Sequence, residues 1–337
     1  ARGTPVDLTV VELRDLAHEL TDHLLTGFPG PNLARAIAQV RAAAKRILGG
    51  MSPGETFNLL AYNDTVEAFA QAPLVKDEQT LQRAGKFLDG IQPRGGSDFH
   101  AALVQALRPR PAPGSLPLVL FLTDGMPTAG NTRELDIGAL AGAENRYRRR
   151  VFTLGIGTEV NPALLDRLAG LSRATPTYVL PGEDIAAAAG ALFHRLGTPV
   201  FEDPVVQSVT VADQADPDRL RELIPVEIPD LFEGEQFLLA GKYLGAQPLR
   251  LRIGGNYLGE PRSFTFTFEL PESGARNRFV PRLWASRRIG VLVERIRQMG
   301  AEVDPTAPQP EPGRDPRFQE LVGEVLRLSR DFGILTE

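Results

Sequence analysis

The sequence predicts an α/β protein in which a doubly wound, mostly parallel sheet is followed by an antiparallel β-rich domain and closing helices. Residues 118–123 are apolar or β-favouring, and the run stops abruptly at Asp124 and Gly125, as is typical of a short strand buried on both faces. As far as Leu196, strand-like runs alternate with helical patterns, which indicates βαβ units. After Pro199, strand-like runs follow one another with turns between them, which indicates an antiparallel domain.

Local signals set the expected elements of the first part. The helix predicted at 33–48 is rich in Ala, follows Asn32 as a candidate N-cap and is closed by Gly49 and Gly50. Strands predicted at 57–62 and 66–70 flank an Asn-Asp turn and form a hairpin. Apolar residues recur at helical spacing within 15–26. The other expected elements are strands at 6–13, 118–123, 151–156 and 177–180 and helices at 77–88, 101–107, 134–149, 161–171 and 183–196.

The second part carries strand patterns first and helical patterns last. Trp284, the only tryptophan, lies in the first helical pattern and is expected in a core or against the β-rich domain. The expected elements are strands at 205–211, 223–228, 236–243, 248–253 and 263–270, helices at 280–299 and 316–332, and a Pro-rich loop at 304–315. We expect three regions: an α/β domain at 1–197, a β-sandwich-like domain at 198–270 and a helical closing segment at 271–337.

Composition excludes several classes of site. The chain has 337 residues, no Cys, four scattered His and a formal net charge of −5, so thiolate metal sites and disulfides are excluded and a zinc enzyme is not expected. No apolar run reaches the roughly 18 residues of a membrane span, and no signal peptide is recognised near the first residue. The basic cluster at 146–150 is expected to be solvated at the end of a helix. Nucleic acid is therefore not an expected partner.

Candidate ligands lie on loops at the presumed ligand edge of the sheet. Asp124 follows the central strand, and Ser97 lies in a Gly-rich loop before a helix. Oxygen ligands without His or Cys suit magnesium or another hard divalent cation. An ion held by few anionic ligands can accept an acidic side chain from a partner, which is a binding mechanism and not a catalytic one. The alternative is that Asp124 caps a turn or the helix predicted at 134–149.

Several short sequence motifs along the chain together resemble those of von Willebrand factor A domains. They are Phe-Asn-Leu-Leu-Ala-Tyr-Asn-Asp at 57–64, Arg-Gly-Gly-Ser-Asp at 94–98, Phe-Leu-Thr-Asp-Gly at 121–125 and Phe-Thr-Leu-Gly-Ile-Gly at 152–157. The similarity is to the subgroup of inter-alpha-trypsin inhibitor heavy chains and their bacterial relatives, and the segments 279–290 and 326–336 resemble that subgroup as well. It covers about nine-tenths of the chain, from residue 31 to the end.

The resemblance implies a metal-ion-dependent adhesion site with ligands from three loops. Ser97 and Asp124 match the positions of the second and third loops. The Asp-x-Ser-x-Ser pattern of the first loop is missing, which removes most of the expected inner shell around magnesium. Asp15, Asp22 or Thr26 could substitute after a rearrangement, although an amphipathic helix at 15–26 is the simpler interpretation.

We therefore expect a protein-protein interaction or adhesion module whose partner presents an Asp or Glu to the ion. The resemblance favours an extracellular or cell-envelope location. One alternative is an assembly subunit with a degenerate metal site that binds through the β-rich domain or the closing helices. A second is a metal-dependent hydrolase using Asp124, for which the sequence identifies no general base. No catalytic residue is predicted.

Overall fold

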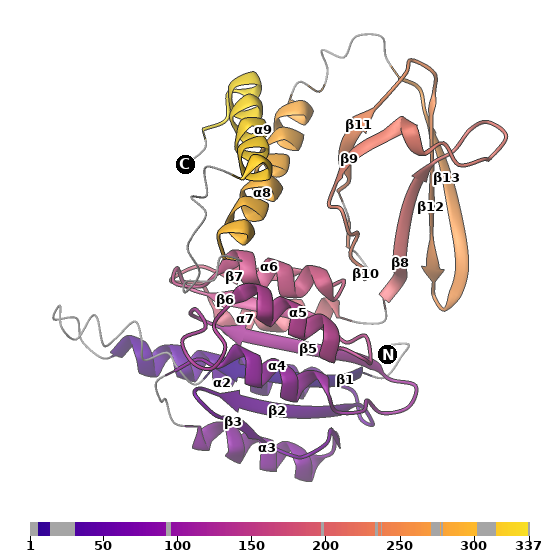
Figure 1. Ribbon diagram of the computed structural model, residues 1–337. Helices are drawn as coiled ribbons and strands as arrows, with labels where there is room; N and C mark the ends of the chain where they lie inside the picture. Colours follow the sequence, from indigo (N-terminus) through magenta and orange to yellow (C-terminus); the bar gives the residue numbers. More distant parts are fainter. Residues whose placement is uncertain are drawn as a thin grey trace. The chain divides into compact units, whose positions relative to one another are not determined.

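The computed structural model describes residues 6–13, 31–91, 96–196, 199–232, 235–236, 238–270, 277, 279–301 and 315–335 (Figure 1). The chain divides into two compact units. Unit 1 comprises Ala1–Val200 together with Pro229–Glu235, and unit 2 comprises Phe201–Ile228 together with Gln236–Glu337. The predicted helix at 15–26, most of the Pro-rich loop at 304–315 and residues 92–95 lie outside the described residues.

Unit 1 is built on a mixed sheet whose core is parallel, as the sequence predicts. Its strand order is β3-β2-β1-β5-β6-β7, and β4 pairs with β2. The strands β1, β2, β5, β6 and β7 run parallel, whereas β3 and β4 run antiparallel to β2. β2 and β3 form the predicted hairpin, and β4 is an additional short strand that the sequence does not predict. Their bounds are β1 Val6–Leu13, β2 Thr56–Tyr62, β3 Val66–Ala68, β4 Leu74–Val75, β5 Leu116–Thr123, β6 Arg150–Ile156 and β7 Pro176–Val179.

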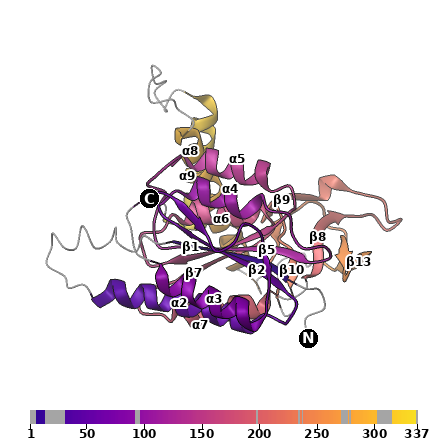
Figure 2. The same cartoon turned by 90° about the horizontal axis from the view of Figure 1, so that it is seen from below.

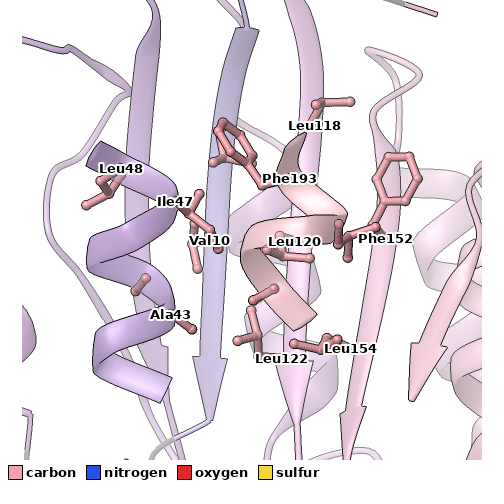
Figure 3. Packing of buried hydrophobic residues seen from close by; sticks show 14 of the residues in the cluster. Val10, Ala43, Ile47, Leu48, Leu118, Leu120, Leu122, Phe152, Leu154 and Phe193 are labelled. Atoms are coloured by element: carbon pink, nitrogen blue, oxygen red, sulfur yellow. The ribbon is translucent and has the colours of Figure 1, made fainter. Parts of the chain in front are cut away.

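Helices cover both faces of this sheet, which confirms the doubly wound architecture (Figure 2). One face packs against α2 (Pro31–Gly50), α3 (Glu78–Gly90) and α7 (Ile185–Arg195), whose apolar residues share one core cluster with Leu118, Leu120 and Leu122 (Figure 3). The other face packs against α4 (Phe99–Leu107), α5 (Glu134–Glu144) and α6 (Pro162–Leu171), together with Val119 and Phe121. Alternate residues of β5 thus feed two cores, because successive strand side chains point to opposite faces.

Side-chain capping explains where several helices start, and one predicted N-cap is wrong. Asp77, Asp98, Asn161 and Asp184 each accept a hydrogen bond from a backbone amide in the first turn of the helix that follows. Asn32 is not an N-cap, because α2 begins one residue earlier with Pro31, whose fixed φ suits a first helical position.

The arginine cluster at 146–150 differs from the sequence-based expectation. The predicted helix at 134–149 ends at Glu144, and the chain turns through Arg148, whose φ is 52°, into β6. Arg146 and Arg148 are exposed as expected, but Arg149 and Arg150 are buried. The solvated face predicted for them is therefore wrong, because Arg150 begins β6 and Arg149 directly precedes it, whereas the helix ends at Glu144.

Unit 2 contains antiparallel strands followed by two helices. The sheet order is β10-β8-β12-β13, and β9 pairs with β11 in a separate ladder. The bounds are β8 Pro199–Ser208, β9 Leu220–Ile224, β10 Leu231–Phe232, β11 Ala240–Tyr243, β12 Leu249–Tyr257, β13 Glu260–Phe268, α8 Phe279–Ala301 and α9 Pro316–Phe332, and a 3-10 helix η1 spans Pro217–Arg219. β10 and the first two residues of β8 are assigned to unit 1.

The closing helices pack on each other around the only tryptophan. Trp284, Ile289 and Leu292 of α8 share a buried cluster with Val325 and Leu328 of α9. The Trp284 indole nitrogen donates to the Glu222 carbonyl at 3.1 Å. This confirms the expectation that Trp284 belongs to a core. None of the helices in the described ranges is both long and apolar enough to cross a membrane.

Candidate functional site

The candidate site lies where the winding direction of the sheet reverses. β1 is flanked by β2 on one side and by β5 on the other. The chain passes from β1 to β2 and later returns to β5, so the carboxyl ends of β1 and β5 border a topological switch point, where open α/β sheets place ligands. Asp124 directly follows β5. Residues 14–30, which follow β1 and include Asp15, Asp22 and Thr26, lie outside the described residues.

The structure joins the two loops that carry Ser97 and Asp124. The Ser97 amide donates to the Thr128 hydroxyl at 2.9 Å, and the Thr128 and Ala129 amides donate to the Ser97 carbonyl at 3.1 and 3.3 Å. Ser97 is 3% exposed and Asp124 is 8% exposed. The residues that the sequence singles out therefore lie on adjoining loops at the same edge of the sheet, close to the surface but largely covered.

A third loop, which follows β2, completes this junction. The Asp98 amide donates to the Asn63 carbonyl at 2.8 Å. Gly96 has a φ of 96°, and a Cβ atom placed there would lie 3.2 Å from the Asp64 Cβ and 3.4 Å from the Ala129 Cβ. Glycine is thus favoured at position 96 both by the left-handed backbone and by the close approach of two other loops.

Sequence reasoning did not assign roles to Asn63 and Thr128. The sequence predicts only a turn at Asn63, whose side-chain oxygen accepts from the Thr65 amide at 2.8 Å and from the Thr65 hydroxyl at 3.0 Å. An Asn directly after a strand is a local signal for such an Asx turn, so this contact could have been predicted from the sequence. Thr128 lies 31 residues from Ser97, and no local pattern predicts such a contact.

Asp124 does not cap the helix that follows it. The N-cap position of α5 is Arg133, which makes no side-chain capping hydrogen bond. Asp98, in contrast, caps α4 through the Ala101 amide at 2.9 Å. The capping alternative for Asp124 at the helix predicted over 134–149 is therefore wrong.

Hydrogen bonds also order the far end of the loop after β5. The Asn131 side chain donates to Asp136 at 3.0 Å and accepts from the Arg133 amide at 3.0 Å. The Asn161 side chain donates to Glu134 at 2.5 Å and so ties the start of α5 to the start of α6. Nearer the start of this loop, Met126 is 52% exposed, which leaves an apolar side chain available to a partner.

The junction of these loops offers oxygen ligands of the kind that bind hard cations, and few of them are charged. Ser97 brings a hydroxyl and Asp124 brings one carboxylate, and both are ligand types that magnesium accepts. Within the described residues, no group of three or more His, Asp or Glu side chains is arranged to hold a metal ion. The donor types therefore fit a divalent cation, while the charge that these two residues supply is small.

Comparison with known proteins agrees with the topology of unit 1. A family model described as von Willebrand factor type A domain matches residues 32–175. Over these residues the chain therefore matches a von Willebrand factor type A domain. The matched residues begin in α2 and end just before β7, and they include Ser97, Thr128 and Asp124.

Relatives extend the similarity beyond the von Willebrand factor A domain. Human inter-alpha-trypsin inhibitor heavy chain H4 is 25% identical over 285 residues, which cover 79% of this chain and 30% of the relative. Mouse inter alpha-trypsin inhibitor, heavy chain 4 is 25% identical over 330 residues, covering 91% of this chain and 32% of the relative. The chain thus spans about a third of the length of these curated relatives.

A solved structure supports the fold. The von Willebrand factor type A protein from Catenulispora acidiphila aligns with a TM-score of 0.56 and 14% sequence identity, covering 98% of this chain and 80% of that chain. At this identity the likeness concerns the fold alone. Taken with the heavy-chain relatives, the von Willebrand factor A domain supports a protein-interaction module.

Proposed function

We propose that the chain binds a protein partner through the loop face of the von Willebrand factor A domain, defined as residues 96–99 and 124–131. The observation that carries the proposal is the set of three hydrogen bonds between Ser97 and the 128–129 backbone and side chain, which holds both loops in one surface at the switch point. The exposed Met126 adds apolar area within that surface.

The loop face is also the proposed cation site. Ser97 would contribute its hydroxyl and Asp124 its carboxylate to magnesium or another divalent ion. Because these residues bring a single negative charge, the ion would keep a strong preference for a further anionic oxygen. An Asp or Glu of the partner supplies such an oxygen, so partner binding would be lost in the presence of a chelator. In line with the resemblance to the heavy chains, we place the protein outside the cell or in the cell envelope.

A second candidate is a metal-independent assembly subunit. It is favoured by the small number of charged ligands at the loop face and by the aromatic side chains that β13 leaves exposed in unit 2, namely Phe264, Phe266 and Phe268. In this case the partner contact would lie on unit 2 and would not respond to a chelator. Neither candidate assigns a catalytic residue.

Nuclear magnetic resonance of the isotope-labelled chain tests the first candidate without a known partner. Mn²⁺ should broaden the amide signals of Ser97, Thr128 and Ala129 before those of Asp89, which lies near the end of α3. With Mg²⁺ present, acetate serves as a stand-in for the partner's carboxylate. It should shift the same loop-face signals, and a chelator should reverse the shift.

Two results would contradict the cation-dependent proposal. One is broadening by Mn²⁺ that is spread over exposed carboxylates without preference for the loop face. The other is an acetate response that is equal with and without the divalent ion, since the carboxylate would then bind without an ion. The metal-independent candidate predicts that acetate and chelator both leave the loop-face signals unchanged.

A further inference from the structure

A short segment from the second half of the chain is part of unit 1. Unit 1 includes Pro229–Glu235, although the residues on both sides of this segment belong to unit 2. The chain therefore crosses between the units three times, after residues 200, 228 and 235. A single linker would have required one crossing.

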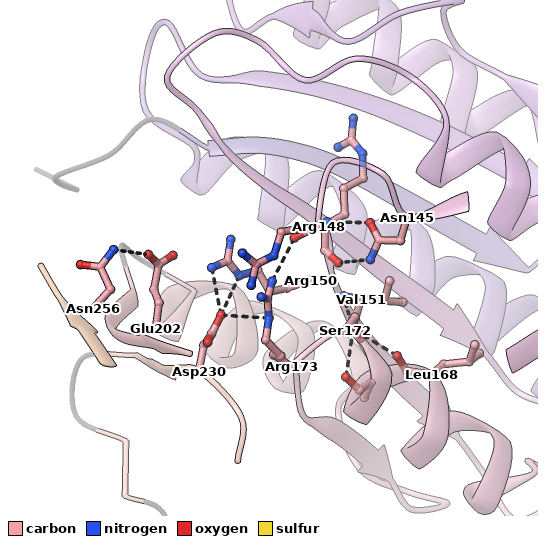
Figure 4. Close-up of polar contacts among 12 residues, drawn as sticks. Asn145, Arg148, Arg150, Val151, Leu168, Ser172, Arg173, Glu202, Asp230 and Asn256 are labelled. Carbon is pink, nitrogen blue, oxygen red and sulfur yellow. Dashed lines mark hydrogen bonds and ion pairs between the residues drawn. The ribbon is translucent and has the colours of Figure 1, made fainter. Parts of the chain in front are cut away.

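A buried carboxylate holds the segment. Asp230, whose side chain is fully buried, accepts from the Arg150 Nε at 2.9 Å and lies 2.9 Å from the Arg150 Nη2 and 3.7 Å from the Arg173 Nε (Figure 4). The Arg150 and Arg173 side chains are 8% and 19% exposed. The Asp230 amide also donates to the Arg173 carbonyl at 3.1 Å. One aspartate thus joins two arginines that lie far from it in sequence.

An aromatic side chain anchors the same segment in the core. Phe232 is 1% exposed and belongs to the cluster that fills the α2, α3 and α7 face of the sheet. Its ring lies 5.5 Å from the Phe152 ring, centroid to centroid, in an edge-to-face arrangement. The Phe232 amide donates to the Glu235 carboxylate at 3.1 Å, and the Glu235 amide donates to the Phe232 carbonyl at 3.0 Å, which closes the segment on itself.

The attachment lies at the edge of the sheet opposite the loop face. Arg150 is the first residue of β6, and Arg173 lies between α6 and β7. Since β5, β6 and β7 are parallel, their amino ends share one edge and Asp124 lies at the other. The segment therefore contributes nothing to the candidate cation site.

We propose that Pro229–Glu235 is a clasp: it returns from the second half of the chain to complete the core of the von Willebrand factor A domain, and unit 1 depends on it for its stability. Removing one partner from a buried ion pair is strongly destabilising, because the remaining charge stays buried without compensation. Here loss of Asp230 would leave the two largely buried guanidinium groups of Arg150 and Arg173 without this carboxylate. Opening the clasp therefore requires a large free energy, whereas an exposed linker would move without breaking a buried ion pair.

Hydrogen exchange of the 337-residue chain tests the clasp. In the wild type, the Asp230 amide should exchange as slowly as the amides of β6. Asp230→Ala and Phe232→Ala should each accelerate exchange of residues 229–232 and of the start of β6 by about tenfold or more. The matched controls are Asp213→Ala, whose ion pair with Arg252 is exposed, and Phe268→Ala, whose ring is 48% exposed. Both should leave this exchange unchanged.

The fluorescence of Trp284 separates clasp opening from global unfolding, because this residue reports on unit 2. The clasp variants should retain the wild-type emission spectrum under native conditions. If Asp230→Ala does not fold, Asp230→Asn can replace it. Asn keeps the shape of the side chain and one of its two acceptor oxygens, so this variant should accelerate hydrogen exchange to an intermediate degree. Fast exchange at Asp230 in the wild type, or equal acceleration in the control variants, would overturn the proposal.

Discussion

At the scale of single residues, the loop face depends on one hydroxyl. The Ser97 amide has the Thr128 hydroxyl as its acceptor. Thr128→Val keeps the shape of the side chain and removes that acceptor. We expect a loss of about 0.5–1.5 kcal/mol in the free energy of unfolding of unit 1, measured by urea denaturation followed by circular dichroism, and a weaker affinity for divalent cations.

Thr128→Ser is the matched control, because it retains the hydroxyl and removes only a methyl group. It should keep the wild-type affinity for Mn²⁺. If the Val and Ser variants bind Mn²⁺ equally, the hydrogen bond between the loops is not what organises the site.

The sequence located two of the residues at this junction but not the contacts between them. Ser97 and Asp124 were found because each follows a recognisable local pattern at a strand or helix boundary. Thr128 and Asn63 were missed as partners, since their hydrogen bonds join loops that are distant along the chain. Arg150 was misplaced for the same reason: its carboxylate partner, Asp230, lies 80 residues away.

At the scale of elements, α3 shows how a cap links stability to pH. The Asp77 carboxylate accepts from the Thr80 amide at 2.7 Å, and this hydrogen bond, followed by one from the Thr80 hydroxyl, holds the pKa of Asp77 below its usual value. A lowered folded-state pKa means that the stabilisation is fully present above the unfolded-state pKa of about 3.9. It is lost as the pH falls through the lower, folded-state value.

Asp77→Asn tests this link, because Asn also caps helices but does not ionise. The wild type should be the more stable of the two in urea denaturation at pH 7, and the difference should shrink as the pH is lowered below about 3.9. A difference that is the same at pH 7 and pH 3 would show that ionisation of Asp77 plays no part.

The α8–α9 pair is the element that closes unit 2, and its core can be probed through its own fluorophore. Leu292 is fully buried beside Trp284. Leu292→Ala should lower the free energy of unfolding of unit 2 by about 2–5 kcal/mol, measured by tryptophan fluorescence in urea. The neighbouring Val293 is 45% exposed, so Val293→Ala should change it by less than about 0.5 kcal/mol. Equal effects would place the helix interface elsewhere.

Element boundaries were predicted well where a local signal marks them. β1, β2 and α9 match the predicted ranges within one residue. The sequence does not predict the end of α5, because residues 145–149 continue a helix-compatible composition. Tertiary contacts instead hold Arg149 just before β6 and Arg150 at its start. Propensity is a weak guide where packing decides.

At the scale of the whole molecule, the two ends of the central sheet have different tasks. The amino ends of β6 and β7 lie beside the clasp residues Asp230 and Phe232, which complete the core. The carboxyl end of β5 leads into the loop face. A rigid scaffold that leaves one loop cluster accessible is a common way to build a binding surface, and it agrees with a von Willebrand factor A domain acting as an interaction module.

We propose that this loop face holds a divalent cation, and calorimetric titration of Mg²⁺ and Mn²⁺ into the 337-residue chain is a direct test. The variants are Asp124→Ala and, as a control, Asp89→Ala, which removes an exposed carboxylate from α3. We expect saturable binding to the wild type and to Asp89→Ala, and none to Asp124→Ala. A wild-type chain that binds neither ion, or an Asp124→Ala chain that binds like the wild type, would contradict it.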